Sequence, residues 1–218
     1  MHDGQNLFDP ATAFGGQDWH VRETARELIS AGRVEPVIIV GIYNAGERRI
    51  DEYAPTQRTD KGGGGRADDY GRMLIHEIMP FIDRTYRTAY GPAHTGMIGS
   101  SLGGLLTLYL GLHFPGLFGR LGLLSPSVWW DDRMILREVA ALTGKPALRI
   151  WLDAGTSEGR ETIKDVRALR NALAAKNWTL GKDLSYREVA GGEHNERSWA
   201  ARLGTVLEFL FPPRPSLA

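Results

Sequence analysis

The chain has 218 residues and no cysteine, and its 26 Lys and Arg are balanced by 26 Asp and Glu, so its formal net charge is zero. This length suits a single globular domain over residues 1–218. A neutral chain carries no electrostatic footprint for nucleic acid or an anionic membrane, and the lack of cysteine excludes disulfides, thiolate metal sites and cysteine nucleophiles. No stretch approaches the ~20 apolar residues of a membrane span, and the N-terminus lacks the regions of a signal peptide, which predicts a cytoplasmic protein.

Apolar runs alternate with helical patterns along the chain, which indicates an α/β fold with a mostly parallel sheet and helices on both faces. The first helix is predicted to extend from an N-cap at Asp18 to Ile29. Residues 37–43 read VIIVGIY and predict a buried strand. Residues 46–66 are polar, with four consecutive glycines, and predict a mobile surface loop near the active face.

The second half of the chain repeats this alternation. A helix is predicted from about Asp68 to Tyr86, and it carries Pro80. The last helix is predicted from about Glu196 to Phe211, where two prolines end it. Four further apolar runs predict strands over residues 95–99, 121–124, 148–152 and 184–189.

The pentapeptide at residues 99–103 spells GxSxG between an apolar run and a strongly apolar, helix-like stretch. That context is typical of a nucleophile elbow, a strained strand-to-helix turn that exposes a serine hydroxyl to a base. Side chains at Gly99 and Gly103 are expected to collide with the neighbouring strand and helix, and glycine tolerates unusual backbone angles. Ser101 is therefore predicted to be a nucleophile.

The same pattern occurs a second time at residues 155–159, around Ser157. Residues 102–112 are apolar all round, as in a helix buried at the middle of a sheet. Residues 160–176 instead alternate charged and apolar positions, which is typical of an outer, half-solvated helix. The chain order of nucleophile, acid and histidine also leaves more room after Ser101 than after Ser157.

A serine hydroxyl needs a base within hydrogen-bond reach and a third group that orients the base. Among six histidines, His194 follows the final strand in a Gly-rich loop and precedes the final helix, which predicts a place at the carboxyl edge of the sheet. The acid is expected in the loop after residues 148–152. Asp153 and Glu158 are nearly equal candidates on their positions alone.

Two backbone N–H groups are needed to hold the charge that develops on the ester carbonyl oxygen. Leu102, the residue after the nucleophile, is expected to supply one of them. The second is expected from Gln5, because Gly4 beside it permits a close backbone approach. A frayed N-terminus is the alternative for this early segment.

Six segments resemble the esterase family that is related to esterase D, feruloyl esterases and enterochelin esterases, all α/β-hydrolases. They are MHDGQNLFD at the start, DEYAPT at 51–56, GSSLGG at 99–104, SPSVWW at 125–130, GTSEG at 155–159 and GGEHNERSW at 191–199. The resemblance runs through nearly the whole chain. It implies Ser101 as nucleophile, His194 as base and Glu158 as acid. It also suggests Trp129 and Trp130 as walls of an acyl or aryl pocket, with ordinary core packing as the alternative.

These observations predict a serine carboxylic ester hydrolase that acts on short-chain or aryl esters and needs no metal or organic cofactor. The alternatives are an acyltransferase or an enterochelin-type siderophore esterase of the same fold, and, in a different class, a non-catalytic binding module. The expected partner is a small-molecule ester rather than nucleic acid or a membrane, and a homo-oligomer is left open.

One departure from the resemblance concerns the start of the sequence. In relatives, the HDG segment is preceded by the strand that lies beside the nucleophile strand, whereas Met1 falls inside that strand. The sheet is therefore expected to lack its N-terminal strands and to have an empty central slot with unpaired backbone groups. A longer natural protein, another chain or segment, or a rearranged sheet would each change this expectation.

Overall fold

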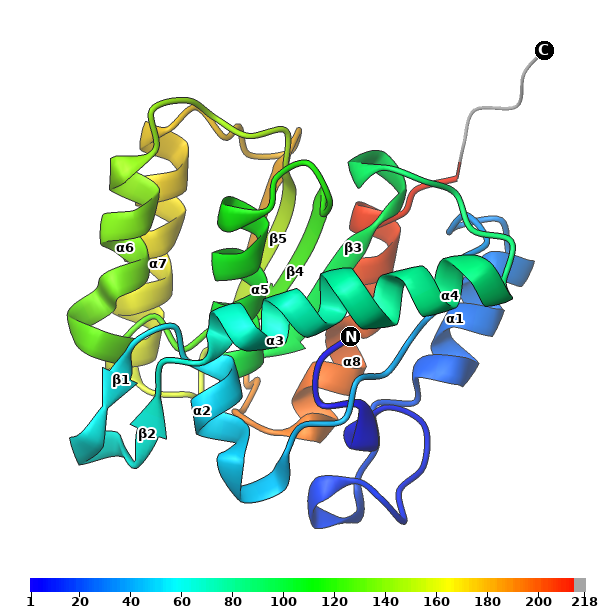
Figure 1. Cartoon of the computed structure of the whole chain (residues 1–218), viewed down its shortest axis with the longest axis horizontal. Coiled ribbons are helices and arrows are strands. Elements are labelled where there is room, and N and C mark those ends of the chain that lie inside the picture. The colour runs from blue at the N-terminus through cyan, green and yellow to red at the C-terminus, as the bar shows by residue number, and fades with distance from the viewer. Residues whose placement is uncertain (214–218) are drawn as a thin grey trace.

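The computed structural model describes residues 1–213 and is built around one parallel sheet (Figure 1). The strands lie in the order β3-β4-β5-β6. Their bounds are Gly96–Ser100 for β3, Arg120–Leu124 for β4, Arg149–Gly155 for β5 and Leu184–Val189 for β6. A helix connects each strand to the next, as parallel neighbours require. All four lie within a few residues of the predicted apolar runs.

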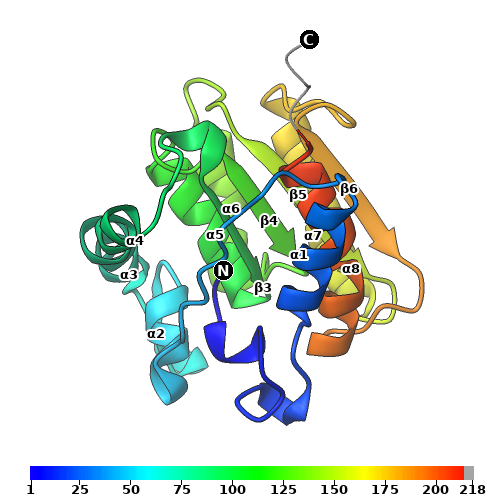
Figure 2. The same cartoon turned by 90° about the vertical axis from the view of Figure 1, so that its right-hand side faces the viewer.

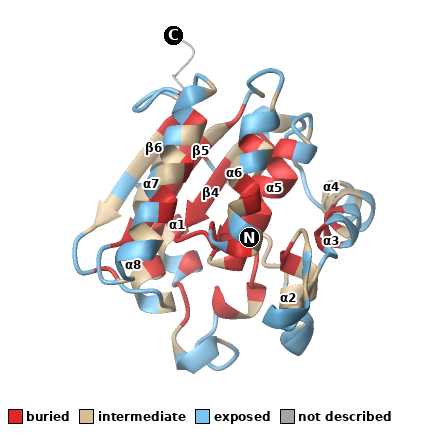
Figure 3. Ribbon diagram, turned by 90° about the vertical axis from the view of Figure 1, so that its left-hand side faces the viewer, coloured by how far each residue is buried: buried red, intermediate tan, exposed pale blue. Residues whose placement is uncertain are grey.

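Helices cover both faces of this sheet, which confirms the expected α/β class (Figure 2). The first face carries α5, α6 and α7, and the opposite face carries α1 and α8. Their bounds are Val21–Ser30 for α1, Leu102–His113 for α5, Trp130–Ala141 for α6, Arg160–Ala175 for α7 and Glu196–Leu210 for α8. Every residue of α5 except His113 is buried (Figure 3). Within residues 1–213, no helix has the length and apolarity to cross a bilayer.

The predicted helix over residues 68–86 is present, but its pitch changes in the middle. It consists of α3 (Ala67–Met73), a π-helical segment (Leu74–Ile78) and α4 (Met79–Thr85), which together form one rod across the front of Figure 1. Pro80 lies in the first turn of α4. Proline has no N–H that could donate to a carbonyl oxygen of the preceding turn. The backbone takes the wider π-helical geometry in that turn.

The start of the first helix differs from the prediction. α1 begins at Val21, with His20 in a left-handed conformation at its N-cap. The carboxylate of Asp18 accepts a hydrogen bond from the backbone N–H of His20 at 3.1 Å. Asp18 is therefore wrong as the predicted N-cap, because its side chain is engaged one turn before the helix.

Residues 46–66, predicted to form a mobile surface loop, contain regular elements that the prediction missed. The segment contains α2 (Arg49–Tyr53) and a small antiparallel hairpin, β1 (Gln57–Arg58) with β2 (Gly63–Gly64). The backbone N–H of Gly64 donates to Asp51 Oδ1 at 2.9 Å. A Cβ on Gly64 would lie 2.3 Å from the carbonyl oxygen of Thr56, so glycine is what lets β2 lie against the residue that precedes β1.

Residues 37–43 do not form the predicted buried strand. They run beside the sheet, but no strand is assigned to them, and Ile38 and Tyr43 are 50% and 62% exposed. Within the described residues, only the backbone of Met1–Gly4 forms hydrogen bonds with this segment and connects it to the sheet. Because the rest of the segment has no ladder partner, its apolar side chains are left half-open to solvent.

Met1–Gly4 lies between residues 40–42 and β3. The Met1 amino group donates to Val40 O at 2.7 Å, and the N–H of Ile42 donates to Met1 O at 2.9 Å. On the other side, the N–H of His2 donates to Ile98 O at 3.0 Å. These first residues therefore form a short bridge in the sheet and are not frayed.

Candidate active site

Ser101 lies at the junction of β3 and α5 with φ 56° and ψ −124°, a conformation that costs energy for a residue with a side chain. The surrounding backbone keeps Ser101 in this conformation. A Cβ on Gly99 would lie 2.6 Å from the carbonyl carbon of Gly103, so any side chain there would push the helix off the strand. A Cβ on Gly103 would make only ordinary contacts, and the collision expected there does not occur.

Glu158 and His194 are brought together at the carboxyl edge of the sheet. His194 Nδ1 lies 2.8 Å from Glu158 Oε2, and the Glu158 side chain is fully buried while that of His194 is 43% exposed. Glu158 Oε1 accepts hydrogen bonds from Ser125 Oγ at 2.6 Å and from the N–H of Gly155 at 2.7 Å. Burial acts to raise the pKa of Glu158, but the three hydrogen bonds outweigh it and lower that pKa below its usual value.

Two glycines explain how these residues meet. Gly155 ends β5, and a Cβ on it would lie 2.2 Å from the carbonyl oxygen of Gly192, in the loop after β6. The N–H of Ser157 donates to the same oxygen at 2.9 Å. The loop that carries Glu158 is thus packed directly on the loop that carries His194.

Asp153, the other candidate acid, has a different role in the structure. Its buried carboxylate accepts hydrogen bonds from Arg202 Nη1 at 2.9 Å and from Trp151 Nε1 at 2.8 Å. Burial raises the pKa of Asp153 to about 6 against the attraction of Arg202. Of the two carboxylates that the sequence left open, only Glu158 contacts His194.

Sequence reasoning did not find the polar cluster that supports Glu158. Ser125 Oγ donates to Glu158 and accepts from Trp199 Nε1 at 3.1 Å and Arg202 Nη2 at 3.2 Å. Arg202 is 5% exposed. A signal existed for it: Arg202 stands on the apolar face of α8, three residues after Trp199, where a charged residue needs a buried partner.

The Ser101 hydroxyl lies 3.3 Å from Ser127 Oγ, and the N–H of Ser127 donates to Ser101 O at 2.9 Å. Within residues 1–213, Ser101 makes no hydrogen bond to His194. Such bonds are often long before substrate binds and tighten in the reacting complex. The His194 ring packs edge-on against Trp199, with ring centres 4.9 Å apart.

Leu102 and Gln5 both carry backbone amides without a backbone acceptor in residues 1–213. Leu102 opens α5, and Gln5 lies in a 3-10 turn, Gly4–Asn6. A Cβ on Gly4 would lie 2.5 Å from the carbonyl carbon of Gly41, so the predicted close approach is present.

Asp3 anchors the turn that contains Gln5. Its carboxylate accepts hydrogen bonds from Arg49 Nε and Nη2, each at 2.7 Å, and its N–H donates to Tyr53 Oη at 2.9 Å. Asp3 is 5% exposed and has a left-handed φ of 54°. The bidentate ion pair fixes this unusual backbone.

The two tryptophans of the SPSVWW segment have different environments. Trp130 is 1% exposed and donates from Nε1 to Thr56 Oγ1 at 3.0 Å. Trp129 is 48% exposed, and Lys61 Nζ lies 6.0 Å from the centre of its ring. Only Trp129 therefore presents its ring to solvent, two residues after Ser127.

The family model described as "Putative esterase" matches residues 1–210. This chain belongs to that esterase family. The family expected from the six segments is confirmed, and with it the class of carboxylic ester hydrolases.

The chain is also similar to individual proteins of known sequence. It is 28% identical over 225 residues to the uncharacterized protein YbbA of Bacillus subtilis (strain 168), covering 97% of this chain and 84% of YbbA. It is 33% identical over 147 residues to the iron(III) enterobactin esterase of Escherichia coli (strain K12), covering 64% of this chain and 34% of that enzyme. It thus spans most of YbbA but about a third of the enterobactin esterase.

The crystal structure of the BES protein from Bacillus cereus has the same fold. Its TM-score with this chain is 0.76 at 20% identity, and the match covers 96% of this chain and 80% of that protein. This agreement extends the expected α/β-hydrolase fold over nearly the whole esterase chain.

Proposed function

We propose that this esterase hydrolyses short-chain or aryl carboxylic esters with Ser101 as nucleophile, His194 as general base and Glu158 as the orienting carboxylate. The observation that carries the proposal is the 2.8 Å contact between His194 Nδ1 and Glu158 Oε2, at the sheet edge where Ser101 sits in its strained turn. Nδ1 is held by the carboxylate, which leaves Nε2 as the proton acceptor.

In the first half of the reaction, Ser101 Oγ attacks the ester carbonyl carbon while His194 Nε2 takes the hydroxyl proton. The tetrahedral oxyanion is held by the backbone N–H groups of Leu102 and Gln5, where each donor is worth ~3 kcal/mol. His194 then gives its proton to the leaving alcohol, and an acyl-serine remains. Glu158 stays ionised and stabilises the imidazolium.

In the second half, water takes the place of the alcohol. His194 removes a proton from the water as it attacks the acyl carbon. His194 then gives this proton to Ser101 Oγ as the bond from Oγ to the acyl carbon breaks, which releases the carboxylic acid and restores the free serine. An acyltransferase would differ only in this step, because another alcohol would attack instead of water. The same residues therefore serve both reactions, and the products distinguish them.

Trp129 supports an aryl group as one part of the substrate. Its half-exposed ring lies close in sequence to Ser127, whose hydroxyl contacts Ser101, and aromatic rings stack favourably on such a surface. A siderophore ester is the second candidate, favoured by the 33% identity to the iron(III) enterobactin esterase. Lys61 beside Trp129 would suit an aromatic acyl group that carries negative charge.

Turnover of 4-nitrophenyl acetate, a set of longer and aryl esters, and a catecholate ester tests the proposal. Ser101→Ala is expected to lose at least ~10⁴-fold in kcat/KM and all labelling by an organophosphonate. Ser157→Ala, from the second GxSxG, is the matched control and keeps both. Wild-type protein that neither turns over an ester nor takes the label would instead be a binding module, and ester products formed with a competing alcohol would identify an acyltransferase.

A further inference from the structure

The segment that carries Gln5 and the segment that carries His194 are joined by a side-chain contact. Asn6 Nδ2 donates a hydrogen bond to Glu196 Oε1 at 3.1 Å. Asn6 directly follows Gln5, and Glu196 lies two residues after His194. Both segments lie beyond the carboxyl ends of the strands (Figure 1). The contact therefore connects one proposed oxyanion donor with the proposed base.

Asn6 is 7% exposed and is held at several points. Its Oδ1 accepts the backbone N–H of Phe14 at 2.9 Å, and its backbone C=O accepts the N–H of Trp19 at 2.8 Å. Because an N–H group can only donate, the amide oxygen of Asn6 must face Phe14 and the NH₂ group must face Glu196. The orientation of the amide is therefore fixed by its surroundings.

Glu196 is fixed by the start of α8. It is the first residue of that helix, directly after the N-cap Asn195. The side chain of Asn195 accepts the backbone N–H of Ser198 at 2.9 Å, as in a well-formed N-cap. A carboxylate that accepts from an amide on this support makes a charge-assisted hydrogen bond. Both partners of the contact thus have a defined backbone.

The charges around Glu196 belong to both sides of the candidate site. Burial raises the pKa of Glu196, the charge of Asp3 raises it further, and the charges of Arg49 and His194 lower it. Asp3 and Arg49 hold the turn that contains Gln5. The carboxylate of Glu196 therefore lies close enough to that turn and to His194 to interact with both.

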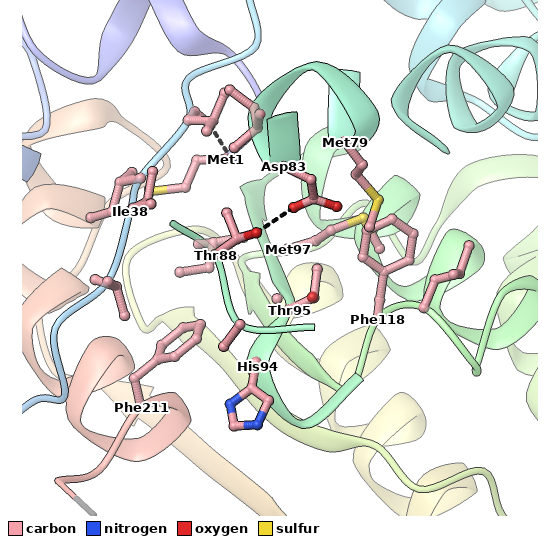
Figure 4. Close-up of a pocket in the computed structure, with 18 of the residues that line it drawn as sticks. Met1, Ile38, Met79, Asp83, Thr88, His94, Thr95, Met97, Phe118 and Phe211 are labelled. Atoms are coloured by element: carbon pink, nitrogen blue, oxygen red, sulfur yellow. Dashed lines mark hydrogen bonds between the residues drawn. The ribbon is translucent and has the colours of Figure 1, made fainter. Parts of the chain in front are cut away.

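The contact is separate from a cavity of about 490 Å³ that borders β3. Met1, Met97 and Phe211 are among the residues that line this cavity (Figure 4). Neither Asn6 nor Glu196 lines it. The hydrogen bond between these two residues is therefore part of the ester site and not of the cavity.

We propose that Asn6 and Glu196 are positioning residues, whose hydrogen bond holds the backbone N–H of Gln5 in place relative to His194. The inference rests on the proposed ester hydrolysis. In that reaction, the Gln5 amide must meet the oxyanion while His194 holds the proton from Ser101, so both groups need fixed places around one carbonyl carbon. A displacement of about 1 Å between them costs ~10²-fold in rate.

Reversing the direction of this hydrogen bond tests the proposal in the full chain. Asn6→Asp replaces the donor with a second carboxylate oxygen that faces Glu196, so the two side chains repel. We expect kcat for 4-nitrophenyl acetate to fall about tenfold or more, with KM within about threefold of the wild type, because the Gln5 amide is displaced without loss of substrate contacts. A wild-type kcat in folded Asn6→Asp would overturn the proposal.

The double variant Asn6→Asp, Glu196→Gln restores the contact in the opposite direction. The amide introduced at position 196 donates to one carboxylate oxygen at position 6, and the other oxygen still accepts from Phe14. We expect kcat to return to within about threefold of the wild type. A folded double variant whose kcat stays about tenfold or more below the wild type would contradict the proposal, whether or not Asn6→Asp folds alone.

Two single variants separate the contact from its charge. In Glu196→Gln, the amide oxygen still accepts from Asn6, so kcat is expected within about threefold of the wild type. Asn195→Asp is the matched control, because Asn195 Nδ2 also donates to a glutamate, Glu193 Oε2 at 2.8 Å, without reaching the segment of Gln5. It is expected to keep kcat. A loss of about tenfold in either variant would assign the effect to charge near the base and reject the positioning role.

Phenethyl trifluoromethyl ketone gives a readout that a change in stability alone does not move. It forms a hemiketal with the nucleophilic serine, and the donors that hold the transition state hold its oxyanion. We expect Asn6→Asp to raise Ki by the factor by which it lowers kcat/KM, and the double variant to restore both. An unchanged Ki beside a lower kcat/KM would rule out the proposal. Wild-type protein that neither turns over an ester nor takes the organophosphonate label would instead reject the ester chemistry itself.

Discussion

β3, the strand that leads to Ser101, is held very differently along its two edges. One edge pairs with β4 in register from Gly96 to Ser100. On the other edge, the described residues supply one backbone hydrogen bond, from His2 to Ile98. The proposed acid and base lie beyond the closed edge, whereas the proposed oxyanion donor Gln5 follows the short bridge on the open edge. The proposed acid and base therefore lie beside a fully paired edge of β3, whereas the proposed oxyanion donor lies beside an edge with one backbone hydrogen bond.

Among the changes that compare the two edges, the largest expected effect is at the closed edge. Glu158→Gln keeps the shape of the side chain but removes the charge that stabilises the imidazolium, so kcat/KM for 4-nitrophenyl acetate is expected to fall ~10³ to 10⁴-fold. Glu161→Gln, on the exposed side of α7 with 76% of its side chain in solvent, is the matched control. Retention of more than a tenth of wild-type activity in Glu158→Gln would rule out its proposed role.

The next effect is at the open edge. Gly4→Ala places a Cβ 2.5 Å from the carbonyl carbon of Gly41, which displaces the turn and with it the amide of Gln5. Loss of one oxyanion donor predicts a fall of ~10²-fold in kcat. Gly144→Ala, where a Cβ meets nothing within 4 Å, controls for the substitution itself. An unchanged kcat in folded Gly4→Ala would remove Gln5 from the mechanism.

The smallest expected effect concerns the support of Glu158. Ser125→Ala removes one hydrogen bond to its carboxylate and raises the pKa of Glu158 toward the ordinary value, since that bond helps to lower it. We expect kcat/KM to fall about tenfold at neutral pH and the acid limb of the pH profile to move to higher pH. Ser185→Ala in β6 is the control. If the acid limb of Ser125→Ala stayed at the pH of the wild type, the role of Ser125 would be packing alone.

The sequence predicts this fold best where a pattern is local. β4, β5 and β6 begin or end within three residues of the predicted runs, and α5 is buried all round, as its composition predicts. Residues 37–43 have an equally good strand pattern but did not form one, because a strand also needs a hydrogen-bonded neighbour along its length.

The choice between Asp153 and Glu158 shows where sequence reasoning on residues alone ends. Both follow the same strand, and what separates them is a contact with a residue 36 positions later. The same holds for the support of Glu158, because Ser125 and Arg202 are 77 residues apart in the chain. Family resemblance implied Glu158, and the position of Arg202 in the sequence indicated only that it needs a buried partner. The contacts that join Ser125 and Arg202 to Glu158 could be found only in three dimensions.

The contact between Gly155 and Gly192 has a consequence for how such enzymes can be altered. Because one backbone fills the space that a side chain of the other would need, the two loops behave as a single interlocked part. A change in the length of either would carry Glu158 away from His194. Engineering that grafts new specificity onto this scaffold should therefore transplant the pair together.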